Sequence, residues 1–461
     1  MTNTPTIETT LFDRAHLSKL VLLGFAVWLH AASSLLAATT LPSAVRNFGG
    51  GHLIGWAFSL YLLGSILAGA STGSLVRTVE LRTALISAAG VYLIGSVICA
   101  IAPDMTVVLI GRLIQGIGGG FLVALVYVAI RHWFAKEQLA KVMALISAIW
   151  SMSAFAGPLV GGTFATFGNW RMAYVAASVQ ALVFIGLTLT DSSKLAGDDA
   201  APKPSIPLER FGLVFLSVLA VAYAGADVQL VKSSGFLMLG IALFVVALRL
   251  DASKSAGRLF PSQPLNLASK VGAGLLMILA ASIASMSFMV YGPIMLETLH
   301  GITPLAAGYM IAFESVCWGA MAVLVARLNT PNEARLIRLG TTLLVVSLAG
   351  FATTMKSGPV LLILVFAGFQ GAGFGLMWAF VVKRITENAA ASEVDETSSA
   401  IPTMQQLGFA FGAAISGIVA NSVGFGDLVT FDIASAAAVW IFAGFIPFAL
   451  VAFVAGRRLA A

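Results

Sequence analysis

Two ionisable residues lie inside long apolar stretches of this sequence, Arg112 in "GRLIQGIGGG" and Glu314 in "GYMIAFESVCWGAM". A charged side chain within a membrane-spanning helix costs about 2.5–3.5 kcal/mol on insertion scales, so each is a candidate functional residue. Arginine stays protonated and can meet a carboxylate or an anionic ligand. A carboxyl group can take up and release a proton, or it can hold a cation. We predict that both residues take part in proton coupling.

Both residues also have a structural interpretation. Arg112 could pair with backbone carbonyls, and Glu314 could be a neutral acid that is hydrogen-bonded to a neighbouring helix. The glycines after Arg112 do not form a phosphate loop, because the spacing from Gly116 puts Phe121 where a third glycine belongs. The chain has no Gly-Lys dipeptide and no clustered acids or histidines within its apolar runs. We therefore expect no enzymatic activity and no cofactor.

The composition indicates that lipid is the solvent around these residues. Of the 461 residues, 59% are hydrophobic and only 10% are charged, whereas soluble domains carry about 25% charged residues. A membrane span needs about 20 mostly apolar residues. The apolar runs predict an all-helical, polytopic protein of fourteen spans, near residues 20–45, 53–76, 83–102, 105–130, 139–166, 172–190, 211–227, 233–250, 270–296, 304–326, 336–355, 358–382, 398–424 and 431–455.

The distribution of positive charge predicts how these spans are oriented. If both termini are cytoplasmic, most of the 26 lysines and arginines fall on the cytoplasmic side. The four that fall outside are Arg46, Arg171, Lys232 and Lys356. The net charge of +6 is therefore a topology signal, and no nucleic-acid partner is needed to explain it. Removing the seventh and eighth spans would preserve the orientation, so charge alone leaves twelve spans as an alternative.

An internal repeat favours fourteen spans. "IQGIGGG" at 114–120 resembles "FQGAGFG" at 369–375, and without a gap "GPLVGG" at 157–162 falls on "GAAISG" at 412–417. Two similar halves of six helices are typical of transporters built around a central site, and the offset leaves room for two further spans between them. The predicted division is a cytoplasmic tail at 1–17, bundles at 18–190 and 270–456, an insert with two helices at 191–269 and a cytoplasmic end at 457–461.

Five motifs in order resemble the major facilitator superfamily, in its fourteen-helix drug:proton antiporter branch. They are "TTLPSAVRNF", "RLIQGIGGG", "AGPLVGG", "NWRMAYVAASV" and "TMQQLGFAFGAAISG". The resemblance implies two six-helix bundles related by pseudo-two-fold symmetry, proton coupling through Arg112, and export, which the family associates with its G-P-x-x-G-G motif. Two features depart from the family. Arg77 and Glu80 replace the aspartate and second glycine of the loop after the second helix, and Ser33 stands where the branch usually has an aspartate.

These observations predict a secondary transporter of the inner membrane that exports amphipathic drugs or metabolites in exchange for protons and confers multidrug resistance. A facilitator or uptake carrier without proton coupling is the alternative. We expect a monomer in the lipid bilayer. The predicted substrate cavity is an apolar, aromatic wall of Trp28, His30, Ser33, Gln115, Tyr127, Phe288, Tyr291, Gln370, Phe374 and Trp378. The predicted helix contacts that must move are at Gly116, Gly157, Pro158, Gly161, Gly162 and Gly371.

Overall fold

The computed structural model describes residues 14–134, 138–190, 208–225, 230–254, 258–326, 332–426 and 429–461, and the regular elements in these ranges are helices. The elements are α1 (Arg14–Phe48), η1 (Gly51–Leu53), α2 (Ile54–Thr78), α3 (Leu81–Ile101), α4 (Met105–Trp133), α5 (Leu139–Thr166), α6 (Arg171–Thr190), α7 (Leu208–Ala224), α8 (Leu230–Ala252), α9 (Lys270–His300), α10 (Pro304–Ala326), α11 (Glu333–Thr354), α12 (Val360–Glu387), α13 (Val394–Ser422), α14 (Phe431–Ala443) and α15 (Ile446–Ala460).

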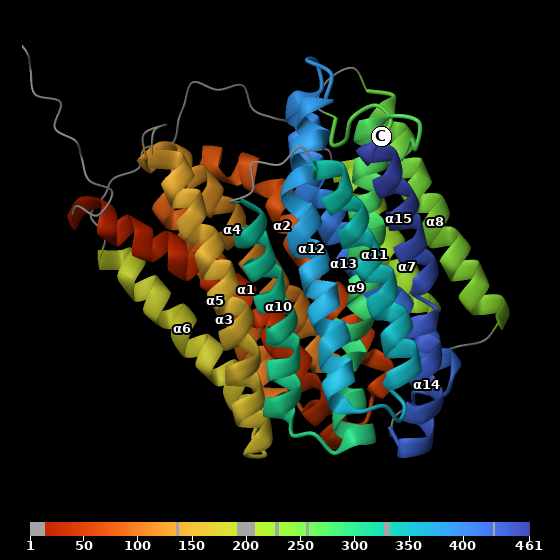
Figure 1. Cartoon of the computed structure of the whole chain (residues 1–461). Coiled ribbons are helices and arrows are strands. Elements are labelled where there is room, and N and C mark those ends of the chain that lie inside the picture. The colour runs from red at the N-terminus through yellow and green to blue at the C-terminus, as the bar shows by residue number, and fades with distance from the viewer. Residues whose placement is uncertain are drawn as a thin grey trace, which may run out of the picture.

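The helices stand side by side in one bundle (Figure 1). The described residues contain thirteen helical segments that are long and apolar enough to cross a membrane, and α14 and α15 together make one of them. α7 has 17 residues and is shorter than these segments. The structure thus has thirteen such segments plus α7 where the sequence predicts fourteen spans. The predicted last span is interrupted, because the chain leaves the helix at Gly444 and Phe445 before α15 begins.

Helix pairing repeats between the two ends of the chain. In the first group, α2 packs on α4, α1 on α5 and α3 on both α4 and α6. In the second group, α10 packs on α12, α9 on α13 and α11 on both α12 and α15. We call α1–α6 the N half and α9–α15 the C half. The hairpin of α7 and α8 packs through α7 against α2 of the N half and α13 of the C half.

Glycines set the closest crossings within each half. A Cβ atom at Gly116 would collide with the carbonyl oxygen of Tyr61, and one at Gly371 would collide with the carbonyl oxygen of Glu314. Four residues after Gly116, a Cβ atom at Gly120 would likewise collide with the carbonyl oxygen of Ser65. Helices in lipid associate by close packing, which small residues permit. Gly116 and Gly371 therefore hold α4 on α2 and α12 on α10 within their own halves.

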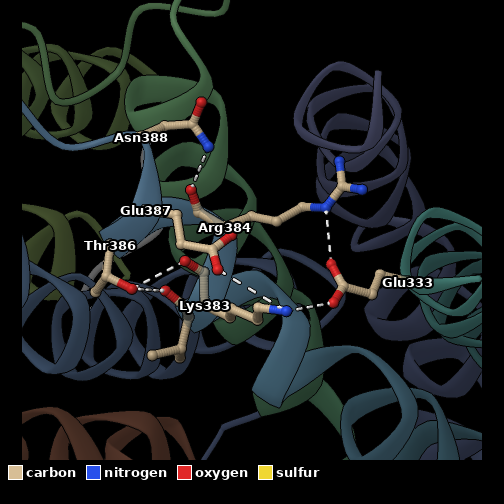
Figure 2. A network of polar contacts seen from close by, with 7 residues as sticks. Glu333, Lys383, Arg384, Thr386, Glu387 and Asn388 are labelled. Carbon is tan, nitrogen blue, oxygen red and sulfur yellow. Dashed lines mark hydrogen bonds and ion pairs between the residues drawn. The ribbon is translucent and has the colours of Figure 1, made fainter. Parts of the chain in front are cut away.

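We call the face of the bundle where α1 begins and α15 ends the terminal face, and the opposite one the distal face. On the terminal face of the C half, Glu333 at the start of α11 binds two cations from the end of α12 (Figure 2). Lys383 Nζ lies 2.7 Å and Arg384 Nε 3.4 Å from its carboxylate oxygens. Arg384 also donates to the carbonyl oxygen of Leu459 in α15, at 3.0 Å. These contacts tie α11, α12 and α15 together.

Contacts between the halves lie towards the distal face. α5 packs on α10 and α2 on α13. At the end of α5, Thr166 Oγ1 accepts a hydrogen bond of 3.2 Å from the backbone nitrogen of Leu305 in α10. Early in α2, Ser59 Oγ donates to the carbonyl oxygen of Ala410 at 3.1 Å. The conformation described here is therefore one in which the halves meet at the distal face.

Candidate functional site

Arg112 is fully buried in the N half and is bound mostly by uncharged groups. Its Nη1 donates to the carbonyl oxygen of Ser33 at 3.2 Å and to Gln115 Oε1 at 2.6 Å. The guanidinium carbon lies 4.0 Å from the centre of the Tyr61 ring, a cation–π contact. Its Nη2 has no partner among the described residues. These contacts fit the structural interpretation of Arg112 well, and its role in proton coupling stays a prediction.

A continuous polar cluster surrounds Arg112. Gln115 Nε2 donates to Ser96 Oγ at 2.8 Å, and the Ser33 hydroxyl is hydrogen-bonded to the Tyr92 hydroxyl. The Tyr61 hydroxyl donates to the carbonyl oxygen of His30 at 2.9 Å, and the rings of these two residues are stacked with centroids 5.5 Å apart. The structure thus brings together four residues that the sequence singled out, namely His30, Ser33, Arg112 and Gln115. α1, α2, α3 and α4 supply the cluster.

Glu314 lies in the C half and is bound by a glutamine. Gln370 Nε2 donates to Glu314 Oε1 at 2.9 Å and lies 3.5 Å from the carbonyl oxygen of Ser285. In the described part of the chain, no lysine or arginine is paired with this carboxylate, whereas Glu297, Glu333 and Glu393 each have such a partner. The amide of Gln370 stabilises this carboxylate by a hydrogen bond but leaves its charge, which only an ion or a proton can neutralise.

An aromatic group begins one helical turn after Glu314. The Trp318 ring stacks on Phe374 with centroids 4.8 Å apart, and the Trp378 ring lies 6.1 Å from it at a tilt. α10 and α12 supply these side chains. Phe374 is buried, whereas Trp318 and Trp378 keep some exposure. Three predicted cavity residues, Gln370, Phe374 and Trp378, are therefore close to Glu314 or to its neighbour Trp318.

The two clusters occupy related positions in the two halves. Gln115 directly precedes Gly116, which packs against the carbonyl oxygen of Tyr61. Gln370 directly precedes Gly371, which packs in the same way against the carbonyl oxygen of Glu314. Tyr61 and Glu314 are thus counterparts at the same crossing. The N half places an arginine beside its tyrosine, and the C half has Ala367 at the corresponding position of the repeat. One half therefore carries a buried cation and the other carries an acid.

Four predicted cavity residues lie apart from these clusters. Trp28 Nε1 donates to Gln180 Oε1 of α6 at 2.9 Å, so it turns towards the other side of the N half. Tyr127 is 44% exposed on α4. Phe288 stacks on Phe351 with centroids 4.4 Å apart, and Tyr291 packs edge-on against Phe425. In this conformation the predicted cavity residues therefore do not line one continuous wall, and they pack in several separate places.

The α5 glycines face two different partners. Gly157 and Gly161 pack on α1, where a Cβ atom at Gly157 would lie 2.7 Å from the carbonyl oxygen of Ala32. Gly162 faces the other half, because its Cβ atom would lie 2.7 Å from Leu305 Cα in α10. Pro158 lies inside α5, and its carbonyl oxygen approaches Gly308 of α10. Of the glycines predicted to mark moving contacts, Gly162 is thus the one that touches the opposite half directly.

Comparison with known proteins identifies the family. A model described as Major Facilitator Superfamily matches residues 23–352, which is well over half of the chain. The chain belongs to the major facilitator superfamily. It is a multi-pass membrane transporter and not an enzyme.

Named relatives and solved structures agree with this assignment. The chain is 28% identical over 430 residues to a "Probable multidrug-efflux transporter" of Mycobacterium tuberculosis, which covers 90% of this chain and 89% of that protein. It is 24% identical to the "Multidrug efflux pump SdrM" of Staphylococcus aureus, over 69% of this chain and 71% of that one. A peptide transporter crystallised with sulfate has the same fold, with a TM-score of 0.71, 15% identity and coverage of 96% and 95%.

Sequence reasoning did not find the ion pair that joins the two halves. Only 5% of the Glu297 side chain is exposed, and its carboxylate forms an ion pair with Arg46 of the other half. The apolar runs could not predict this contact, because it depends on how α1 and α9 meet. The available signal was two opposite charges near the same predicted membrane surface. Asp104 is exposed and caps α4, and Asp227 lies outside the described residues.

Proposed function

We propose that this transporter exports amphipathic drugs or metabolites across the inner membrane in exchange for protons, by alternating access. In this proposal both termini are cytoplasmic, so the terminal face is the cytoplasmic one. The multidrug-efflux names of the relatives support export, and the apolar and aromatic residues near Glu314 suit amphipathic ligands. With the halves in contact at the distal face, substrate enters from the cytoplasm or the inner leaflet.

The observation that carries proton coupling is the environment of Glu314. Its carboxylate accepts a hydrogen bond from Gln370 and has no lysine or arginine partner among the described residues. A proton is the simplest cation that can neutralise this half-buried carboxylate. Ser33, which replaces the usual first-helix aspartate, is hydrogen-bonded to Tyr92 and cannot carry a proton in this way. Glu314 is therefore the acid that couples proton entry to substrate exit.

Arg112 supports the cycle from the N half in this proposal. Its charge is buried and is not balanced by a carboxylate among the described contacts of its cluster. A cation in the N half and an acid in the C half attract one another when the halves approach, which favours the ionised acid and release of its proton. Gly162 and Pro158 provide the surface on which α5 and α10 move. The small substrate and protons are the transporter's partners, and the bilayer is its environment.

The test is proton-driven efflux by Glu314→Gln in inverted vesicles. Glutamine keeps the shape and the hydrogen bond to Gln370 but cannot release a proton. We expect efflux driven by a pH gradient to be abolished, while substrate binding stays within about tenfold, or 1.4 kcal/mol. Glu387→Gln removes an exposed carboxylate from the terminal face and should pump as the unaltered protein does. Normal efflux by Glu314→Gln with an unchanged pH dependence would refute the proposal.

The alternative is a facilitator or uptake carrier of the same fold without proton coupling. The specific observation in its favour is Ser33, because the branch that the sequence resembles usually has an aspartate there. A facilitator would equilibrate substrate across a liposome membrane and would never concentrate it when a pH gradient is applied. Accumulation against a substrate gradient, driven only by a pH gradient, excludes this alternative.

A further inference from the structure

We propose that Arg46 and Glu297 form a gate on the distal face, which each transport cycle must break and remake. The proposal rests on the alternating access proposed above. Arg46 Nη1 is paired with Glu297 Oε2, so the ion pair joins the end of α1 to the end of α9. These helices belong to opposite halves. An outward movement of the halves at this face would separate the two charges.

The geometry of the pair suits a contact that opens. The Arg46 side chain is 51% exposed and Glu297 only 5%. Arg46 is held in place by a second hydrogen bond of 2.6 Å, from its Nη2 to Ser43 Oγ. The other carboxylate oxygen of Glu297 is buried and has no partner among the described residues. In the closed state Glu297 thus relies on Arg46, and in an open state water can reach it, so opening leaves no unpaired charge buried.

Arg171 and His300, which also lie near this face, are bound elsewhere. Arg171 donates to the carbonyl oxygen of Ala102 at 3.0 Å and lies over the rings of Phe48 and Trp170. His300, one turn after Glu297, has its Nε2 atom 2.8 Å from the carbonyl oxygen of Met355. Arg46 and Glu297 are therefore a matched pair within the described part of this face.

Uncharged contacts also join the described parts of the two halves at the distal face. Asn421 Nδ2 donates to the carbonyl oxygen of His52 at 3.0 Å and to that of Gly225 at 2.5 Å. One amide thus joins α13 to the N half and to the turn after α7. Hydrogen bonds between charged groups are roughly twice as strong as those between neutral groups. Loss of the ion pair should therefore shift the balance from the closed towards the open state.

The experiment measures how readily the distal face opens. Thr39 is a suitable reporter because it is fully buried, and Gly161 of α5 and Gly308 of α10 both pack against its side chain. It lies seven residues before Arg46, or roughly 10 Å along the helix. Thr39→Cys is introduced into full-length protein in which Cys99 and Cys317 are replaced by alanine. A membrane-impermeant maleimide is then added from the distal side, without substrate or a proton gradient.

We expect Arg46→Ala and Glu297→Gln each to raise the labelling rate about tenfold. Arg46→Lys, and the exchange Arg46→Glu with Glu297→Arg, should restore a rate within about threefold of the parent. Arg171→Gln removes a charge from the same face and should leave the rate unchanged. Rescue by the exchanged pair is a result that loss of structure cannot produce.

Labelling at the parent rate in both single variants would overturn the gate, as would equally fast labelling in the exchanged pair. The readout needs no proton coupling. A failure of Glu314→Gln to impair efflux would therefore refute the proposed function while leaving the gate result intact.

Discussion

At the scale of residues, Arg112 and Glu314 differ in what surrounds them. The sequence could identify both, because a charged residue within an apolar run stands out whatever its partners in the fold are. It could not place Trp28, which turns to Gln180, because lipid-exposed helices are apolar all round and their apolar runs do not reveal which side faces the core. The pairing of Glu297 was missed for a related reason, since its partner lies in the other half.

Arg112→Lys should lower both thermal stability and transport. A lysine keeps the charge but cannot reproduce the planar fork that binds Ser33 and Gln115 while stacking on Tyr61. We expect a loss of about 1–3 kcal/mol, because a buried acceptor on Gln115 is left without its donor. Thermal unfolding in detergent measures the loss. Unchanged stability together with lost transport would show that the guanidinium group acts in the cycle and not in the scaffold.

At the scale of elements, the internal repeat predicted which helix crossings are equivalent in the two halves, whereas the apolar runs predicted only where helices lie. The matched glycines of "IQGIGGG" and "FQGAGFG" lie at equivalent crossings, as packing demands. Helix bounds were less predictable. α1 starts at Arg14 and α9 extends to His300, beyond the predicted ends, because helices continue past the apolar core. The break before α15 was not predicted, since the sequence is apolar on both sides of it.

Gly116→Ala and Gly371→Ala should each destabilise the protein by about 1–3 kcal/mol, because the added methyl group collides with a backbone oxygen of the facing helix. Gly186→Ala in α6 is the matched control, since nothing lies within 4 Å of a Cβ atom there. Alanine should be neutral or slightly stabilising at that position. Melting temperatures of the three variants in one detergent test this. Equal melting temperatures would mean that α4 and α12 can move away from α2 and α10 without a loss of stability.

At the scale of the whole molecule, the two ends of α8 provide a test of the predicted orientation. Val231 at the start of α8 is 82% exposed, and Lys254 just after this helix is also exposed. With Cys99 and Cys317 replaced, Val231→Cys should be labelled by an impermeant maleimide only from outside the cell, and Lys254→Cys only from the cytoplasm. Labelling of both from the cytoplasm would remove α7 and α8 from the membrane and restore the twelve-span alternative.

Coupling of substrate movement to proton movement is the central claim. Purified protein in liposomes with a pH-sensitive dye inside, and with the membrane potential clamped at zero, tests it directly. Addition of a transported substrate to one side should move protons in the opposite direction, and Glu314→Gln should abolish that proton flux. Substrate that crosses the membrane with no proton movement would contradict the account and would make this protein a facilitator.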